Sequence, residues 1–178
     1  ITSTTPSEGK TFVAENLAQT YAMHDERVLL IDADLRLPNV ANTLELDTAG
    51  KGINLWFNEN LPLEDAIVRQ VVPNMDVLCV GSACNNPTQI INSKRFKEMF
   101  VALREKYDRI IVDTPPIAAV SDILNVLPLC DGMILTVKFD AIQRMMVKAN
   151  LNRLLDARVP VFGAVLNQMK LRTAHYYT

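Results

Sequence analysis

The residues with the clearest chemistry form a short loop near the start of the chain that closes on Gly9-Lys10-Thr11. A polyphosphate is bound by backbone N–H groups that point inward and by the positive end of a helix dipole behind them. A loop of this kind supplies both, with the lysine reaching the β- and γ-phosphates and the threonine hydroxyl binding Mg²⁺. The residues assigned to this nucleotide-binding loop are Thr5, Pro6, Ser7, Glu8, Gly9, Lys10, Thr11 and Phe12.

The loop departs from the standard phosphate-loop pattern at one position. That pattern has a glycine five residues before Gly9, where this chain has Thr4, so Gly9 is the only glycine in the loop. The alternative interpretation is a solvated loop whose lysine binds nothing. The acidic residues and the strand pattern in the rest of the chain distinguish between these two interpretations.

Three acidic side chains follow short apolar runs. Asp32 and Asp34 come after Val28–Ile31, and Asp113 follows Arg109–Val112 just before two prolines. Short apolar runs closed by an acid are typical of central parallel strands. Residues two apart lie on the same side of a strand, so Asp32 and Asp34 are both expected to point at the loop. We expect Asp113 to hold Mg²⁺ directly or through water, the alternative role being a helix N-cap.

The elements that must position these residues follow from the apolar pattern. Strands are expected near Ile1–Ser3, Val28–Ile31, Met75–Val80, Arg109–Val112, Met133–Val137 and Val161–Leu166. Helices are expected over Phe12–Tyr21, Val40–Leu46, Ile90–Leu103, Ile123–Leu127 and Ala141–Asp156, whereas Ile53–Phe57 and Leu63–Val68 are ambiguous. A loop is expected at Ala118–Asp122.

This alternation predicts an α/β fold, with a doubly wound, mostly parallel sheet and helices on both faces. Ligands bind such sheets at the carboxyl ends of the strands. The side chains expected at that edge come from four segments and are Lys10, Asp32, Asp34, Asp113 and Asn167. Their convergence favours the nucleotide-binding interpretation of the loop.

The length, charge and cysteine content of the chain limit its domain number, its partners and its cysteine chemistry. A chain of 178 residues with 49% hydrophobic residues can bury one core, so a single domain is expected. A net charge of -2 without a basic run argues against a nucleic-acid partner. The three cysteines have neither CxxC spacing nor nearby histidines, which favours free thiols. We expect a soluble fragment of a longer product, because the chain begins at Ile1 within a strand pattern and has neither a membrane-length apolar run nor a signal peptide.

Taken together, three stretches resemble the Walker A, A′ and B motifs of bacterial tyrosine kinases (BY-kinases). These stretches are Thr5–Phe12, Leu29–Pro38 and Ile110–Pro116, and the Asp-x-Asp-x-Arg-x-Pro pattern at Asp32–Pro38 is the specific part. Such kinases are cytoplasmic domains of polysaccharide co-polymerases, within the MinD/ParA group of P-loop ATPases. Asn86–Ser93 and Gly163–Asn167 also resemble segments of that family.

The resemblance implies a role for each matching residue, with ATP and Mg²⁺ as cofactors. Lys10 would neutralise the transferring phosphate, and Thr11 would hold Mg²⁺ together with Asp34 and Asp113. Asp32 would be the base that takes the tyrosine hydroxyl proton, since a phenol with a pKa near 10 needs help at neutral pH. Asn167 would contact the adenine.

The same resemblance implies the domain boundaries and the partners. Residues 1–170 would form the kinase domain and residues 171–178 the start of a tyrosine-containing tail, with Tyr176 and Tyr177 as autophosphorylation sites. The acceptor would be the protein's own tail or that of a neighbouring subunit in a ring-shaped homo-oligomer. A transmembrane activator would lie outside this chain, and the domain would be cytoplasmic, at a bacterial inner membrane.

Three functions are therefore compared. The first is an ATP-dependent protein-tyrosine autokinase that regulates capsular or exopolysaccharide synthesis and export. The second is a MinD/ParA-type switch ATPase that dimerises on ATP and binds a membrane or DNA. Its signature lysine would fall at Thr5, so the pattern favours the kinase. The third is a non-catalytic nucleotide-sensing module, which a poorly binding Ser7-Glu8 loop would favour.

Overall fold

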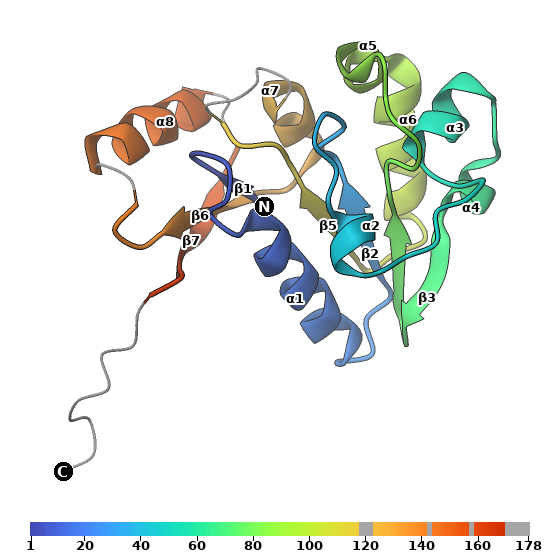
Figure 1. Cartoon of the computed structure of the whole chain (residues 1–178), viewed down its shortest axis with the longest axis horizontal. Coiled ribbons are helices and arrows are strands. Elements are labelled where there is room, and N and C mark those ends of the chain that lie inside the picture. Colours follow the sequence, from blue (N-terminus) through green and yellow to red (C-terminus); the bar gives the residue numbers. More distant parts are fainter. Residues whose placement is uncertain (118–122, 142–143, 157–158, 170–178) are drawn as a thin grey trace.

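Seven strands form the centre of the molecule in the computed structural model, which describes residues 1–117, 123–141, 144–156 and 159–169. One group of paired strands has the order β3-β4-β2-β5 and the other has the order β1-β6-β7 (Figure 1). The strands are β1 (Thr2–Ser3), β2 (Val28–Asp32), β3 (Val68–Val72), β4 (Met75–Leu78), β5 (Arg109–Asp113), β6 (Met133–Lys138) and β7 (Val161–Asn167).

Backbone hydrogen bonds between the first residues and β5 join the two groups of strands. The α-amino group of Ile1 donates to the Val112 carbonyl at 2.7 Å, and the Thr114 N–H donates to the Ile1 carbonyl at 3.1 Å. The order across the whole sheet is therefore β3-β4-β2-β5-β1-β6-β7. All its paired strands are parallel except β3 and β4. The prediction of a doubly wound, mostly parallel sheet is confirmed.

Helices cover both faces of this sheet. They are α1 (Lys10–Ala22), α2 (Val40–Thr43), α3 (Ile53–Asn58), α4 (Leu63–Ala66), α5 (Pro87–Asn92), α6 (Lys94–Arg104), α7 (Ile123–Val126), the 3₁₀ turn η1 (Leu127–Leu129) and α8 (Arg144–Asp156). Leu29 and Ile31 of β2 pack into the core beneath α3, α5 and α6, whereas Val28 and Leu30 pack under α1. Because both faces of β2 are buried, its sequence is continuously apolar rather than alternating.

Four elements differ from the expected pattern. The segment Val68–Val72 is an antiparallel edge strand that the ambiguous apolar pattern did not identify. The helix expected over Ile90–Leu103 is two helices, α5 and α6, separated by Ser93 in an extended conformation. Helix α2 ends at Thr43 rather than near Leu46, and β4 ends at Leu78. The loop expected at 118–122 lies outside the described residues.

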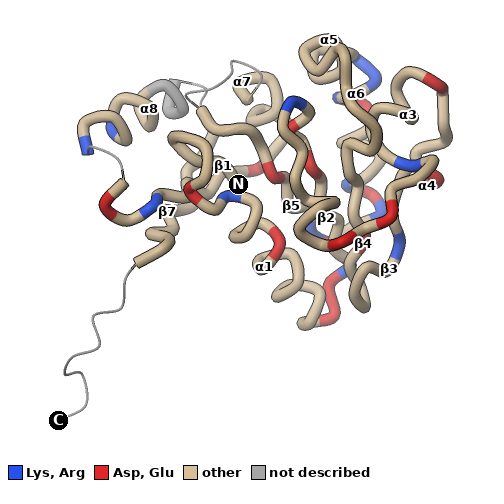
Figure 2. The backbone as a smooth tube through the Cα atoms, viewed as in Figure 1, with Lys and Arg blue, Asp and Glu red and all other residues tan. Residues whose placement is uncertain are grey.

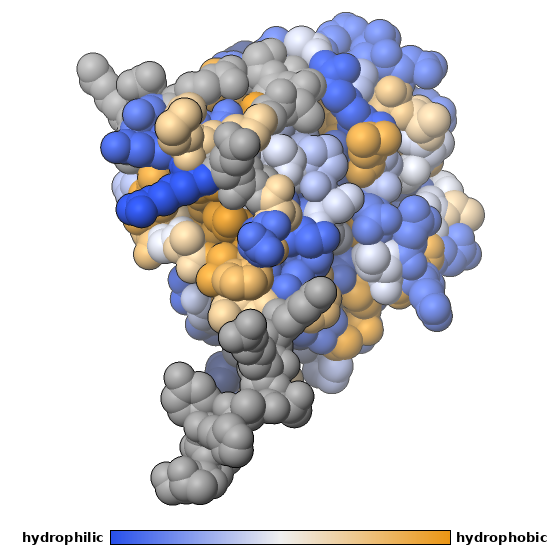
Figure 3. All heavy atoms as spheres, turned by 60° about the vertical axis from the view of Figure 1, so that its left-hand side comes forward, coloured by the Kyte–Doolittle hydropathy of each residue, from blue (hydrophilic) through white to orange (hydrophobic). Residues whose placement is uncertain are grey.

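The β7 side of the molecule carries exposed apolar side chains. Phe162 and Leu166 of β7 and Met145 and Met146 of α8 are all exposed. Figure 3, which turns this side forward, shows apolar side chains gathered there beside strongly polar ones. Within the described part of the chain, no helix has the length and apolar character to cross a membrane.

Candidate nucleotide site

The phosphate loop occupies residues 4–9, between the end of β1 and the start of α1. Gly9, which precedes the helix, has a left-handed φ of 91°, and a Cβ atom there would collide with the Asn167 side-chain amide. Glycine is therefore required at position 9 for its backbone angle and for space. Ser7 also has a left-handed φ, 64°, at a position where glycine would be less strained.

The Glu8 side chain holds the loop from within. It is buried, and its two carboxylate oxygens accept hydrogen bonds from the Thr5 N–H at 2.7 Å and from the Lys138 N–H of β6 at 3.1 Å. The Glu8 carbonyl accepts a hydrogen bond from the Asn167 amide at 2.9 Å. Thus Glu8, assigned to nucleotide binding from its position, contributes its side chain to the shape of the loop.

Lys10, Thr11, Asp34 and Asp113 come together beside the loop. The Lys10 ammonium lies 3.2 Å from an Asp34 oxygen and 3.5 Å from Oδ2 of Asp113. The Thr11 hydroxyl donates to that same Asp113 oxygen at 2.6 Å. Figure 2 shows the acidic ends of β2 and β5 facing the start of α1. The predicted convergence of these side chains is therefore present in the structure.

The surroundings of Asp113 suit a hard cation. Its second oxygen, Oδ1, is buried and has no hydrogen-bond partner among the described residues. Burial raises the pKa of Asp113, while the Lys10 ammonium and the Thr11 hydrogen bond act in the opposite direction. An unpartnered carboxylate oxygen beside a threonine hydroxyl fits Mg²⁺, which takes one or two carboxylates and completes its shell with phosphate and water. Accordingly, the described residues contain no cluster of three or more His, Cys, Asp or Glu able to hold a metal ion alone.

Asp32 has different surroundings from Asp34. Its carboxylate is fully buried and accepts three backbone hydrogen bonds, from Asp34 at 3.1 Å, Asn39 at 3.0 Å and Val40 at 3.1 Å. Burial, together with the nearby Asp113 charge, raises the pKa of Asp32 to about 7 despite these bonds. Asp32 therefore holds the loop that follows β2, whereas Asp34 lines the open pocket.

A cavity of about 640 Å³ opens beside Lys10 and Thr11, between α1 and the loop after β2. Glu15 also lines it, although no motif in the sequence marks this residue. Glu15 is buried and accepts a hydrogen bond from the Thr43 hydroxyl, and burial raises its pKa. The available signal was a charged residue on the face of α1 that carries the buried Ala14, Ala18 and Ala22.

Asn167 lies on the other flank of the phosphate loop. Its amide bonds to Glu8, and Gln168 next to it approaches the Ser7 carbonyl at 3.4 Å. Neither residue is among those that line the cavity beside Lys10. Tyr176 and Tyr177 lie outside the described residues.

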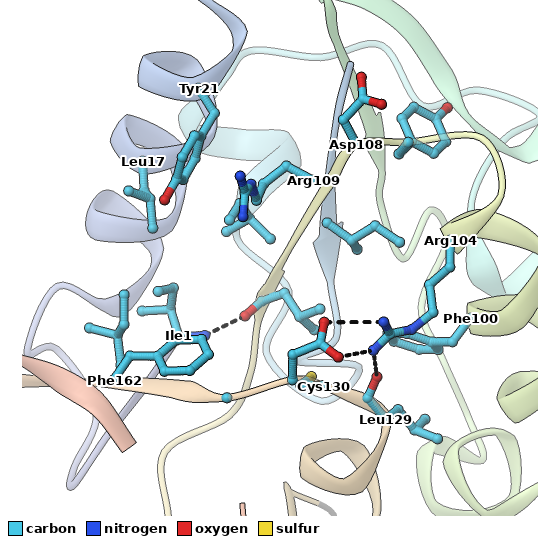
Figure 4. A pocket seen from close by; sticks show the side chains of 17 residues that line it. Ile1, Leu17, Tyr21, Phe100, Arg104, Asp108, Arg109, Leu129, Cys130 and Phe162 are labelled. Atoms are coloured by element: carbon cyan, nitrogen blue, oxygen red, sulfur yellow. Dashed lines mark hydrogen bonds and ion pairs between the residues drawn. The ribbon is translucent and has the colours of Figure 1, made fainter. Parts of the chain in front are cut away.

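A second cavity, of about 340 Å³, lies along β5 from Arg109 to Val112 and is lined by none of the loop residues 4–9. Figure 4 shows Ile1 and Phe162 together at one end of it, and Arg104 and Phe100 at the other. The Arg104 guanidinium pairs with Asp131 at 3.0 Å and donates to the Leu129 carbonyl at 3.1 Å. None of the predicted site residues lines this cavity, whereas Lys10, Thr11 and Asp34 line the first one.

The chain is similar in sequence to an ATPase-type domain family and to bacterial tyrosine-protein kinases. The family described as the AAA domain matches residues 7–155. The chain is 34% identical over 176 residues to the tyrosine-protein kinase ptk of Acinetobacter johnsonii, covering 99% of this chain and 24% of the relative. It is 33% identical over 171 residues to the tyrosine-protein kinase YwqD of Bacillus subtilis, covering 96% of this chain and 72% of the relative.

The fold is also similar to those of solved kinase domains. The VpsO kinase domain is similar with a TM-score of 0.89 and 32% identity, over 95% of this chain and 83% of that one. The kinase domain of the Escherichia coli tyrosine kinase ETK has a TM-score of 0.89 and 31% identity, over 99% of this chain and 69% of that one. The septum site-determining protein MinD of Pyrococcus horikoshii, solved with Mg-ADP, shares the fold at 22% identity, with a TM-score of 0.78 over 93% of this chain and 67% of that one.

Proposed function

Because this chain belongs to the bacterial protein-tyrosine kinases, P-loop ATPases of the MinD/ParA-like type, we propose that it transfers the γ-phosphate of ATP to tyrosine residues of its own tail or a neighbour's. The observation that carries this proposal is the convergence of Lys10, Thr11, Asp34 and Asp113 next to the phosphate loop. The chain spans about a quarter of the length of the Acinetobacter relative. The kinase activity of the whole protein is therefore proposed from this part of it.

The residues present fit ATP with Mg²⁺. Backbone N–H groups of the loop and the N-terminus of α1 would hold the phosphates, and Lys10 would neutralise the transferring group. Thr11, Asp34 and Asp113 would hold the metal, which would withdraw charge from the β- and γ-phosphates. Asn167 would contact the adenine from the flank of the loop opposite the cavity.

Asp32 is proposed as the base that accepts the phenol proton. A carboxylate with a pKa raised by burial is a better match to this task than an exposed one, since proton transfer is most effective when the pKa lies near the working pH. Both Asp32 oxygens hold backbone N–H groups in this structure. The proposed role therefore requires one of these hydrogen bonds to be exchanged for the phenol.

The biological setting completes the proposal. Tyr176 and Tyr177 would be the first phosphorylated residues of the tail. In a homo-oligomer, the active site of one subunit would phosphorylate the tail of its neighbour. The kinase would control capsular or exopolysaccharide synthesis and export from the cytoplasmic side of a bacterial inner membrane, with a transmembrane activator. The support for this setting is the family resemblance of the Asp32–Pro38 motif.

Incubation with γ-labelled ATP and Mg²⁺, followed by detection of phosphotyrosine, tests the proposal. The wild-type chain is expected to label itself, and Lys10→Met is expected to reduce labelling by about 100-fold or more because it removes a charge that acts on the transition state. Lys94→Met, at an exposed lysine of α6, is the matched control and should label normally. ATP hydrolysis with dimer formation and no phosphotyrosine would instead support a switch ATPase. Nucleotide binding without turnover would support a sensing module.

A further inference from the structure

Two large apolar side chains stand exposed at the mouth of the nucleotide cavity. Phe12 of α1 is 62% exposed and Leu37 of the loop after β2 is 74% exposed, and both line the same cavity as Lys10 and Asp34. We call this pair the apolar lip. Exposed apolar side chains grouped at a polar site are a sign of ligand contact.

The lip is tied to the residues that would perform the chemistry. Phe12 is the third residue of α1, after Lys10 and Thr11. The Leu37 backbone N–H donates to an Asp34 oxygen at 3.1 Å, and Pro38 restricts the backbone angles of Leu37, the residue before it. The backbone of each lip residue is therefore linked directly to a residue of the site, Phe12 through α1 to Lys10 and Leu37 through a hydrogen bond to Asp34.

The position of the lip assigns it to the γ-phosphate side of the site. The Lys10 ammonium, which reaches the β- and γ-phosphates in loops of this type, pairs with Asp34 and Asp113. Lys10 and Asp34 line the same cavity as the lip. Asn167, the residue proposed to contact the adenine, bonds to the Glu8 carbonyl and does not line this cavity. A group seated against Phe12 and Leu37 therefore approaches the transferring phosphate and not the base.

We propose that the apolar lip seats the aromatic ring of the acceptor tyrosine and makes Phe12 and Leu37 positioning residues for phosphoryl transfer. This inference rests on the proposed kinase function. The phenol oxygen bonds to the γ-phosphorus while the bond from that phosphorus to its bridging oxygen breaks, and the electron pair leaves with ADP. The phenol proton passes to the carboxylate base, for which Asp32 is proposed above.

The lip also accounts for selection of tyrosine. A phenol ring offers an apolar face to Phe12 and Leu37 and carries its hydroxyl at the far end, toward Lys10. Serine and threonine hydroxyls are attached close to the backbone, so they have no ring to seat and would not reach the phosphate from the lip. Peptides with serine in place of tyrosine should therefore be poor acceptors.

Two-substrate kinetics with a separate acceptor peptide test the proposal. The enzyme carries Tyr176→Ala and Tyr177→Ala, which remove its own acceptors without leaving aromatic rings that would compete for the lip, and the peptide has the sequence of residues 171–178. Leu37→Ala and Phe12→Ala are each expected to raise KM for the peptide about tenfold, which corresponds to about 1.4 kcal/mol. For Leu37→Ala the increase should appear in KM for the peptide and not in KM for ATP.

Three controls make the outcome decisive. Leu37→Met, which keeps an apolar side chain, should restore a low peptide KM, and Met23→Ala, at an 84% exposed residue just after α1, should change neither KM. The peptide with phenylalanine at both tyrosine positions should inhibit competitively, and both alanine variants should weaken this inhibition. Because inhibition needs no turnover, it reports on ring binding alone.

Two results would overturn the proposal and are distinguishable from failure of the kinase function. An unchanged peptide KM in both alanine variants, with active enzyme, removes the lip as the acceptor site. An equal increase in KM for ATP assigns the lip to the nucleotide base. If the wild-type chain phosphorylates neither its own tail nor the peptide, the kinase function itself fails and the lip proposal falls with it.

Discussion

At the scale of single residues, Glu8 gives a phosphate loop with one glycine a fixed shape. Its buried carboxylate binds the Thr5 N–H within the loop and the Lys138 N–H at the end of β6. Glycines elsewhere in such loops let the backbone approach a phosphate, but they also leave the loop flexible before the ligand binds. Here the side chain of Glu8 orders the loop in advance.

The left-handed backbone of Ser7 makes Ser7→Gly a favourable substitution. A side chain at a φ of 64° is strained, and glycine removes this strain while it increases the entropy of the unfolded chain by a smaller amount. The free energy of unfolding should rise by about 0.5 kcal/mol, measured by urea denaturation. ATP affinity, measured by titration calorimetry, should be equal or higher, and a loss of stability would contradict the strain argument.

Asp32 should make stability depend on pH in the absence of nucleotide. Its pKa is about 7 in the folded chain, above the ordinary 3.8, so the folded state holds more protons between these values. Its stabilising contribution is complete below pH 3.8 and is lost as the pH rises through about 7. The free energy of unfolding should therefore fall from pH 5 to pH 7 and level off above it. The upper limit is about 1.4 kcal/mol for each unit of pKa difference.

Urea denaturation at pH 5, 6, 7 and 8, without Mg²⁺, measures this dependence. Asp32→Asn removes the titrating group and should flatten the profile, although Asp113 and Glu15 have pKa values shifted in the same direction. A stability that rises with pH over this range in the wild-type chain would show that Asp32 is ionised in the folded state.

At the scale of elements, Ser93 decides where one helix stops and the next begins. Its hydroxyl accepts the Phe96 N–H at 3.0 Å, as an N-cap of α6, and donates to the Ile90 carbonyl at 2.7 Å at the end of α5. Both hydrogen bonds require the extended backbone that breaks the apolar repeat. Ile90 and Phe96 nevertheless pack into the same core.

Ser93→Ala should therefore destabilise the chain. Losing an N-cap side chain costs about 1 kcal/mol. Urea denaturation should show the midpoint moving down with the m-value unchanged, since the surface exposed on unfolding stays the same. Ser93→Thr keeps a hydroxyl and is the matched control. Equal stability of the alanine variant would mean that water replaces the cap without loss.

Strands that are buried on both faces could be predicted from the sequence because they appear as continuous apolar runs, as in Val28–Ile31. The edge strand β3 could not, because Arg69 and Gln70 are exposed and interrupt its apolar pattern. The convergence of Lys10, Asp34 and Asp113 followed from strand polarity alone. The internal role of Glu8 did not, because it depends on a contact with Lys138 that no local pattern encodes.

At the scale of the whole molecule, the two-residue strand β1 joins the halves of the sheet and leads directly into the phosphate loop. It pairs with β6 on one side, and Ile1, just before it, bonds to β5 on the other. The Thr2 hydroxyl adds a buried hydrogen bond to the Pro115 carbonyl at 3.1 Å. A ligand held by this loop and by Asp113 of β5 would therefore strengthen the junction between the halves.

Mg²⁺ with ATP should raise the thermal unfolding temperature of the whole chain. A ligand at 100 times its Kd stabilises by about 2.7 kcal/mol, which corresponds to roughly 5–10 °C for a chain of this size. Differential scanning fluorimetry with ATP and Mg²⁺, and with ATP and EDTA, measures the metal-dependent part. Asp113→Asn should remove most of that part, and an increase that is the same with EDTA would contradict the assignment of Asp113 as a metal ligand.

The close packing of Gly9 against Asn167 has a consequence for how such chains diverge. A methyl group at position 9 would overlap the side-chain amide of Asn167 in β7, so position 9 cannot change while asparagine stays at 167. Alanine at position 9 becomes sterically acceptable only where the residue facing it is shorter than asparagine, and the left-handed backbone still has to relax. Among relatives, position 167 should therefore vary while glycine stays at position 9, and a change at position 9 should be found only together with a shorter residue at 167.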